Sequence, residues 1–276
     1  MNDPNSYRPI SMTSVICKIL ERIINNRLMA YLETSKFFSS NQNGFRKERS
    51  TIDCISKLEI SIKNALVKKS QLSAVFFDLR KAYDTTWRHQ IISVLKNWGI
   101  TGQILNFIKN FVTDRKFIVR IGNTFSEKVT QDNGVPQGSV LSPTLFLIAI
   151  NDILDELPKE VQGTLYADDL VIFSSSNNPR TTERLLQRSL KRLEHWSKNN
   201  GIIFSEQKTK SLTFTNKRRP LLPRLRLYGT TLENVSEVKY LGLIFDRKMS
   251  WKSHVNSVID SCKSSLNVIK MIAHQD

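Results

Sequence analysis

The feature that most constrains this sequence is an adjacent pair of aspartates, Asp168 and Asp169, between two short apolar runs at 164–166 and 170–173. Short runs of this kind, separated by polar residues, predict a β-hairpin, here with residues 167–169 as its turn. Two carboxylates this close cannot both stay ionised away from water without a cation. With no His or Cys cluster beside them, such oxygen ligands favour Mg²⁺ or Mn²⁺ over Zn²⁺. The alternative is a solvated acidic turn, because turns favour Asp.

A third acidic side chain, Asp78, directly follows an apolar run at 72–77 that predicts a buried strand. Enzymes with α and β structure commonly place reactive groups at the end of such a strand. If this strand lies beside the predicted hairpin, Asp78 meets Asp168 and Asp169. A carboxylate trio could hold two divalent ions about 4 Å apart, an arrangement that stabilises the attacking and leaving oxygens of an in-line phosphoryl transfer.

The charge of the chain fits a polyanionic substrate. The 276 residues include 41 Lys and Arg against 25 Asp and Glu, a net charge of +16, which favours nucleic acid as a partner ahead of an acidic membrane. Three widely spaced cysteines predict no disulfide framework. No apolar run approaches the roughly 20 residues of a membrane span, and the first residues lack the apolar region of a signal peptide. We therefore expect an intracellular protein of the nucleus, the cytoplasm or both, neither secreted nor bound to a membrane.

Hydrophobic periodicity predicts helices that alternate with short strand pairs. The expected helices include 14–33, 51–68, 181–199 and one from about 251, and the expected strand pairs include 116–121 with 126–130 and 225–228 with 238–245. No repeated βαβ unit occurs, which favours an α+β fold over a doubly wound sheet. A basic stretch could hold a nucleic-acid backbone or be merely solvated: Lys217, Arg218, Arg219, Arg224 and Arg226.

Seven segments, taken in chain order, resemble the reverse transcriptase domain of non-LTR retrotransposons, the LINE-type and jockey-like elements. They are YRPIS at 7–11, 42–51 with its GFR and RST elements, DLRKAYD at 78–84, GVPQGS with LSP at 134–143, YADD at 166–169, the lysine-bearing 201–210, and YLGL at 240–243. The resemblance implies a right-hand polymerase with an antiparallel palm sheet. The expected subdomains are fingers at 1–70, palm at 71–112, a fingers/palm hairpin at 113–130, palm at 131–248 and the start of a thumb at 249–276, so that the thumb is missing or only begun.

The resemblance also implies a two-metal site for Mg²⁺, with Mn²⁺ as a substitute. The expected ligands are the carboxylates of Asp78, Asp168 and Asp169 and the backbone carbonyl of Leu79. Lys208 is expected to protonate the pyrophosphate leaving group as a general acid, with Lys210 as the alternative.

Four further residues are expected to bind the incoming nucleotide. Tyr83 would exclude a ribonucleotide by clashing with its 2′-hydroxyl, the alternative being a core tyrosine. Gln137 would contact the nucleotide, and Gly138 would let the backbone approach it, unless this glycine serves only a turn. Arg46 would bind the triphosphate, because a guanidinium pairs with phosphate oxygens.

These features together predict an RNA-directed DNA polymerase that extends a DNA primer on an RNA template with deoxynucleoside triphosphates. The chain starts abruptly at the first fingers motif and ends near the start of a thumb, so one alternative is a truncated, non-catalytic RNA-binding remnant. A group II intron-type maturase, which shares the YADD motif, is another. An RNA-dependent RNA polymerase shares the chemistry, but the expected barrier at Tyr83 disfavours it.

Overall fold

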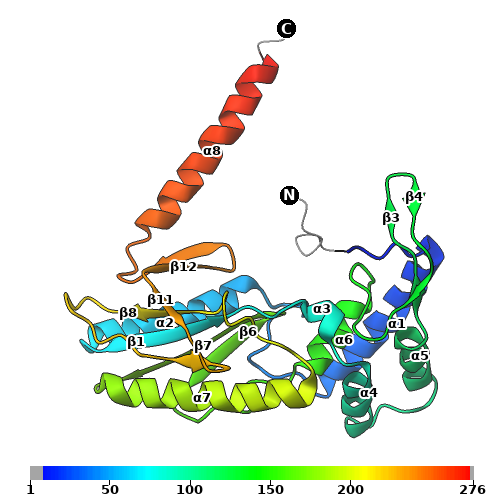
Figure 1. The fold of residues 1–276 in the computed structure, drawn as a ribbon, viewed down its shortest axis with the longest axis horizontal. Coiled ribbons are helices and arrows are strands. Elements are labelled where there is room, and N and C mark those ends of the chain that lie inside the picture. The colour runs from blue at the N-terminus through cyan, green and yellow to red at the C-terminus, as the bar shows by residue number, and fades with distance from the viewer. Residues whose placement is uncertain (1–8, 274–276) are drawn as a thin grey trace.

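A five-stranded sheet forms the centre of the molecule, which we describe over residues 9–273 of a computed structural model (Figure 1). Its strands in spatial order are β11 (Glu233–Val235), β8 (Lys210–Phe214), β1 (Gln71–Phe77), β7 (Asp169–Ser176) and β6 (Gln162–Tyr166). All neighbours are antiparallel except β11, which pairs with β8 in parallel. Tyr7 and Arg8 of the first predicted motif lie outside the described residues.

Both faces of this sheet are covered, and the central strand β1 is buried along its whole length. Since side chains alternate along a strand, Val75 and Phe77 face one side and Phe76 the other. The first side packs against helix α7 (Pro179–Asn200), which follows β7. The second packs against helix α2 (Thr51–Val67). A strand buried on both faces needs a continuous apolar run, which is the pattern of 72–77.

A helical lobe lies beside the sheet (Figure 1). It contains α1 (Val15–Thr34), α4 (Arg88–Asn97), α5 (Gly102–Val112) and α6 (Ser142–Ala149), which share one apolar cluster. The short helix α3 (Ala82–Thr85) connects β1 to this lobe. Residues 71–112, expected as one palm segment, therefore divide between the sheet and the helical lobe.

Smaller hairpins and one projecting helix complete the structure. The hairpin expected at 116–130 forms as two short ladders, β2 (Lys116–Phe117) with β5 (Val129–Thr130) and β3 (Arg120–Ile121) with β4 (Thr124–Phe125). The expected pairing of 225–228 with 238–245 is wrong, because each segment pairs locally: β9 (Arg226–Leu227) with β10 (Thr230–Thr231), and β12 (Glu237–Tyr240) with β13 (Leu243–Asp246). Helix α8 (Lys252–Ala273) extends away from the body and buries none of its residues (Figure 1). Across residues 9–273, every helix is too short or too polar to cross a bilayer.

Candidate active site

The predicted hairpin at the paired aspartates is confirmed. Tyr166 of β6 pairs with Asp169 of β7, which leaves Ala167 and Asp168 as a two-residue turn, with Ala167 at a φ of 54°. Asp169 is thus the first residue of a strand and not part of the turn. On the other side of β7, Phe77 of β1 pairs with Leu170 in antiparallel register. Asp78, the residue that directly follows β1, therefore lies beside Asp169.

The three carboxylates lie close enough to influence one another. Loss of solvent around Asp169, followed by repulsion from Asp168 and then Asp78, raises the pKa of Asp169 to about 6. Its side chain nevertheless keeps an exposed surface, as does that of Asp168. A hard divalent cation suits this all-oxygen donor set and would relieve its repulsion. Among the described residues, no three acidic, His or Cys side chains form a ready metal cage, so the aspartate side chains would have to move closer together to share an ion.

A lysine lies next to this cluster. Lys208 Nζ is 3.9 Å from Asp78 Oδ2, and its side chain is 74% exposed, so it can move along the site. Lys210, the alternative and the first residue of β8, forms an ion pair with Glu233 of β11. The structure therefore places Lys208, and not Lys210, beside Asp78. Leu79 directly follows Asp78, and its carbonyl was expected to complete a metal site. It forms an isolated antiparallel β-bridge with Phe204.

Tyr83 connects the carboxylates to the GVPQGS segment. Burial, followed by the charge of Asp168, raises the pKa of Tyr83 to about 12, which places the phenol near that carboxylate. Its ring stacks on Phe146 of α6 with centroids 5.1 Å apart and an interplanar angle of 20°. The backbone carbonyl of Tyr83 accepts a hydrogen bond of 2.8 Å from Val135 N. The tyrosine is half-buried, so it is neither a core residue nor a free surface side chain.

The GVPQGS segment itself is held close to α3. Gly134 has a φ of 80°, and a Cβ there would lie 2.5 Å from the Asp84 carbonyl oxygen, so the approach requires glycine. Further along, the carbonyl of Gln137 accepts a 2.7 Å hydrogen bond from Ser11 N. Gln137 is half-buried and Gly138 is exposed, and a Cβ at Gly138 would lie 3.1 Å from Ile10 Cγ2.

Glu21 of α1 holds the end of this segment and was missed by the sequence analysis. Its side chain is fully buried, and its carboxylate accepts hydrogen bonds from the Ser139 hydroxyl, from Val140 N at 2.8 Å and from Leu141 N at 3.2 Å. The signal in the sequence is weak: Glu21 lies seven residues before Leu28, on the same face of the helix as this buried leucine.

Arg88 holds the start of the same segment and was also missed. Its guanidinium donates to the carbonyls of Gly134 at 2.9 Å, Gln131 at 2.7 Å and Asn133 at 3.2 Å. An anion on α1 and a cation on α4 thus fix the two ends of the segment that carries Gln137 and Gly138. Nothing local in the sequence pairs either residue with this segment.

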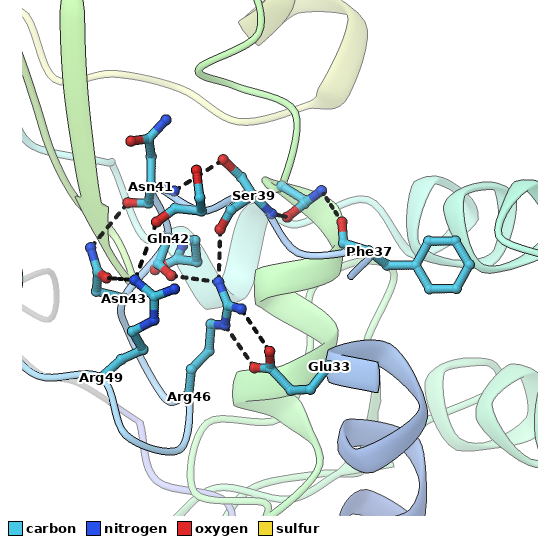
Figure 2. A network of polar contacts seen from close by, with 10 residues as sticks. Glu33, Phe37, Ser39, Asn41, Gln42, Asn43, Arg46 and Arg49 are labelled. Atoms are coloured by element: carbon cyan, nitrogen blue, oxygen red, sulfur yellow. Dashed lines mark hydrogen bonds and ion pairs between the residues drawn. The ribbon is translucent and has the colours of Figure 1, made fainter. Parts of the chain in front are cut away.

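The predicted contact between Arg46 and a triphosphate is not supported by the structure (Figure 2). Nε and Nη2 of Arg46 donate to the two carboxylate oxygens of Glu33, at 2.7 and 2.6 Å. Nη1 donates to the carbonyls of Ser39 and Gln42. The Arg46 side chain is only 8% exposed. Arg46 therefore stabilises the fold of its own loop, and a phosphate would have to displace Glu33 to reach it.

That loop contacts the aspartate turn through Gln42, another residue that sequence reasoning did not select. Its Oε1 accepts from Gly44 N at 2.8 Å and from Ala167 N at 3.1 Å. A Cβ at Gly44 would lie 2.2 Å from Ala167 N, so only glycine permits this contact. Residues 42–44 therefore fix the position of the turn that carries Asp168.

Comparisons with known proteins show the family of the chain. Residues 2–245 match the family model described as "Reverse transcriptase (RNA-dependent DNA polymerase)". The chain is 31% identical to a probable RNA-directed DNA polymerase from transposon BS of Drosophila melanogaster, over 99% of this chain and 31% of the relative. It is 30% identical to the RNA-directed DNA polymerase from mobile element jockey of Drosophila funebris, over 96% of this chain and 29% of the relative. The chain thus spans about a third of the length of these relatives.

A solved structure extends the comparison to the fold. Telomerase from Candida tropicalis, in a form truncated from the C-terminal domain, superposes with a TM-score of 0.55 at 14% identity, over 83% of this chain and 44% of the telomerase chain. The predicted fold class, an α+β right-hand polymerase with a mainly antiparallel sheet, is confirmed.

Proposed function

Because the chain belongs to the reverse transcriptase family, with relatives in non-LTR retrotransposons, we propose that it forms the polymerase part of an RNA-directed DNA polymerase. In this proposal it extends a DNA primer on an RNA template with deoxynucleoside triphosphates and releases pyrophosphate. The single observation that carries the proposal is the meeting of Asp78 with Asp168 and Asp169 at the ends of adjacent strands.

The carboxylates would hold two Mg²⁺ ions, or Mn²⁺, with the carbonyl of Leu79 as a further ligand. Bound divalent ions supply stabilisation of the negative charge on the phosphoryl oxygens. Asp78 and Asp168 are the principal ligands in this proposal, and Asp169 supports them. The raised pKa of Asp169 supports this role, since an added cation would be favoured by a site with surplus negative charge.

Other side chains act on the nucleotide and the leaving group. Tyr83 stands near Asp168 with its ring fixed against Phe146, where it would clash with a 2′-hydroxyl. Gln137 and Gly138, on the segment held by its two ends, contact the incoming nucleotide. Lys208, a mobile cation beside Asp78, donates a proton to the departing pyrophosphate oxygen.

We also propose the subdomain roles that follow. Fingers occupy 1–70, the palm 71–112 and 131–248 with the central sheet and α7, a fingers/palm hairpin 113–130, and the start of the thumb 249–276 with α8. Three free cysteines, Cys17, Cys54 and Cys262, support a reducing, intracellular location.

Primer extension on a primed RNA homopolymer with Mg²⁺ tests the proposal. Asp168→Ala removes an expected metal ligand that contributes several kcal/mol to stabilisation of the transition state. We therefore expect it to lower the rate of primer extension by about a thousandfold or more. A suitable control is Asp152→Ala, because Asp152 bonds Trp196 away from the cluster. If the unaltered chain and Asp168→Ala are equally inert but still bind the RNA, the polymerase proposal fails and a non-catalytic RNA-binding role replaces it.

A further inference from the structure

An open groove of about 590 Å³ lies along the outer side of α7, away from the carboxylate cluster. Its lining is strongly basic. The cations are Arg180, Arg184, Arg188, Lys191 and Arg224, and all five are exposed. One carboxylate, Glu183, and one amide, Gln187, complete the lining.

The geometry of the helix puts these cations in a row. Arg180, Arg184 and Arg188 recur every four residues, so they lie on one side of α7 about 6 Å apart along its axis. Like charges at this spacing lower helix stability by roughly 0.2–0.5 kcal/mol per pair. Repulsion between these arginines therefore disfavours the isolated helix. A bound polyanion would relieve that repulsion.

The opposite wall of the groove is fixed as well. Gln187 Nε2 donates to the Arg226 carbonyl at 2.9 Å, and Gln187 Oε1 accepts from Arg226 N at 2.8 Å. Leu225 is fully buried between the exposed Arg224 and Arg226. Arg224 therefore stands on a backbone segment fastened to α7, and it is not part of a loosely solvated loop.

The groove cations are not neutralised by the protein. Within residues 9–273, no carboxylate lies within ion-pair distance of any of these five side chains. Other cations of the same chain do have partners: Arg46 binds Glu33, and Lys210 binds Glu233. The groove is thus a concentrated patch of available positive charge.

Its position separates it from the catalytic cluster. β7 begins at Asp169 and ends at Ser176, and α7 begins three residues later at Pro179. The eight residues of β7 span about 25 Å at roughly 3.3 Å per residue. Arg180 and Arg184 therefore lie toward the end of the sheet opposite to Asp168, outside reach of a primer end at the aspartates.

We propose that this groove binds the phosphate backbone of a nucleic-acid strand at a second contact, separate from the catalytic cluster. Four arginines favour phosphate, because the guanidinium fork pairs with two phosphate oxygens. Nothing in the groove selects a sequence, so the contact is to the backbone alone. The inference does not depend on polymerase activity, because it rests on α7 and the 223–226 segment and on none of the catalytic side chains.

The test compares two variants that each remove two positive charges. Arg184→Gln with Arg188→Gln empties the groove of its central cations while keeping good helix formers. Lys68→Gln with Lys69→Gln is the matched control, since these exposed lysines follow α2 on the other face of the sheet. Binding of a labelled single-stranded RNA of about 30 nucleotides is followed by fluorescence anisotropy over a salt series. Losing two phosphate contacts should reduce the slope of log K against log salt by about 1.4 in the groove variant only.

Equal slopes for the groove variant and the lysine control would overturn the proposal. A second arm uses vesicles of phosphatidylcholine with phosphatidylserine. If the groove variant loses vesicle binding but keeps the RNA slope, the groove is a membrane contact and the proposal is wrong. Primer extension on a short primed template should be the same for both variants and the unaltered chain. A failure of the polymerase proposal would remove extension from all three and leave the salt slopes unaffected, so the two failures are distinguishable.

Discussion

Two acidic regions of the candidate site differ in how their carboxylates are satisfied. Asp168 and Asp169 keep exposed surface at the end of the central sheet, where partial loss of solvent and then the like charges of Asp168 and Asp78 raise the pKa of Asp169. Glu21 is fully buried on α1, where three donors from residues 139–141 surround its carboxylate. A satisfied buried carboxylate stabilises structure, while exposed carboxylates that repel one another are available to a ligand. The difference supports a structural role for Glu21 and the proposed metal-binding role of the aspartates.

The largest effect expected from this comparison is on stability, at Glu21. Glu21→Ala would leave the Ser139 hydroxyl and the backbone N–H groups of Val140 and Leu141 without an acceptor. Since each unsatisfied buried donor costs about 1–3 kcal/mol, we expect the free energy of unfolding to fall by about 3 kcal/mol or more. Urea unfolding followed by circular dichroism measures it.

Two controls make this result specific. Glu21→Gln keeps an acceptor oxygen and should lose less, about 1 kcal/mol. Asp168→Ala removes a repelling charge and should leave the free energy of unfolding unchanged or raise it. If Glu21→Ala unfolds at the same urea concentration as the unaltered chain, the contrast between the two regions is wrong.

The same contrast explains what the sequence could predict. Asp78 and the hairpin around the paired aspartates were located correctly because their signals are local: each lies at the end of an apolar run whose length and pattern specify a strand. Helices α1, α2 and α7 were also found to within a few residues, because their apolar spacing is regular. Site residues at the ends of predicted strands were therefore placed as accurately as the strands themselves.

Contacts between segments that are distant in the sequence could not be predicted from such patterns. Glu21 reads as one charged residue in an amphipathic helix, and only the packing of α1 shows that it faces residues 139–141. The sequence predicted Arg46 as a phosphate ligand because it does not show that Glu33 is the partner of this arginine. The Asp169 position differed by one residue because hairpin register depends on the two-residue turn, which the composition of the turn does not specify.

An intermediate effect is expected at Tyr83, which lies between the two regions. Tyr83→Ala removes the ring that stacks on Phe146 and stands near Asp168. Preference for deoxynucleotides over ribonucleotides, measured as the ratio of their kcat/KM values, should fall by about tenfold to a hundredfold. Tyr83→Phe keeps the ring and should keep the preference. If Tyr83→Ala discriminates between deoxynucleotides and ribonucleotides as well as the unaltered chain, Tyr83 does not select the sugar of the nucleotide.

The smallest effect concerns the pH dependence of stability at Asp169. Its carboxyl titrates near 3.8 when unperturbed and at about 6 in the folded chain. Between these values the folded state holds a proton that the unfolded state has released, so this group lowers stability as pH rises from about 4 to 6.

Asp169→Asn removes that contribution. In metal-free buffer the variant should therefore be more stable than the unaltered chain above pH 6, and the two should converge near pH 4. Because solvent screens the exposed side of Asp169, we expect a difference of only about 1 kcal/mol. Parallel stability profiles for the two proteins between pH 4 and 7 would mean that neither burial nor the neighbouring aspartates disfavour the charged form of Asp169, and the contrast with Glu21 would then be wrong.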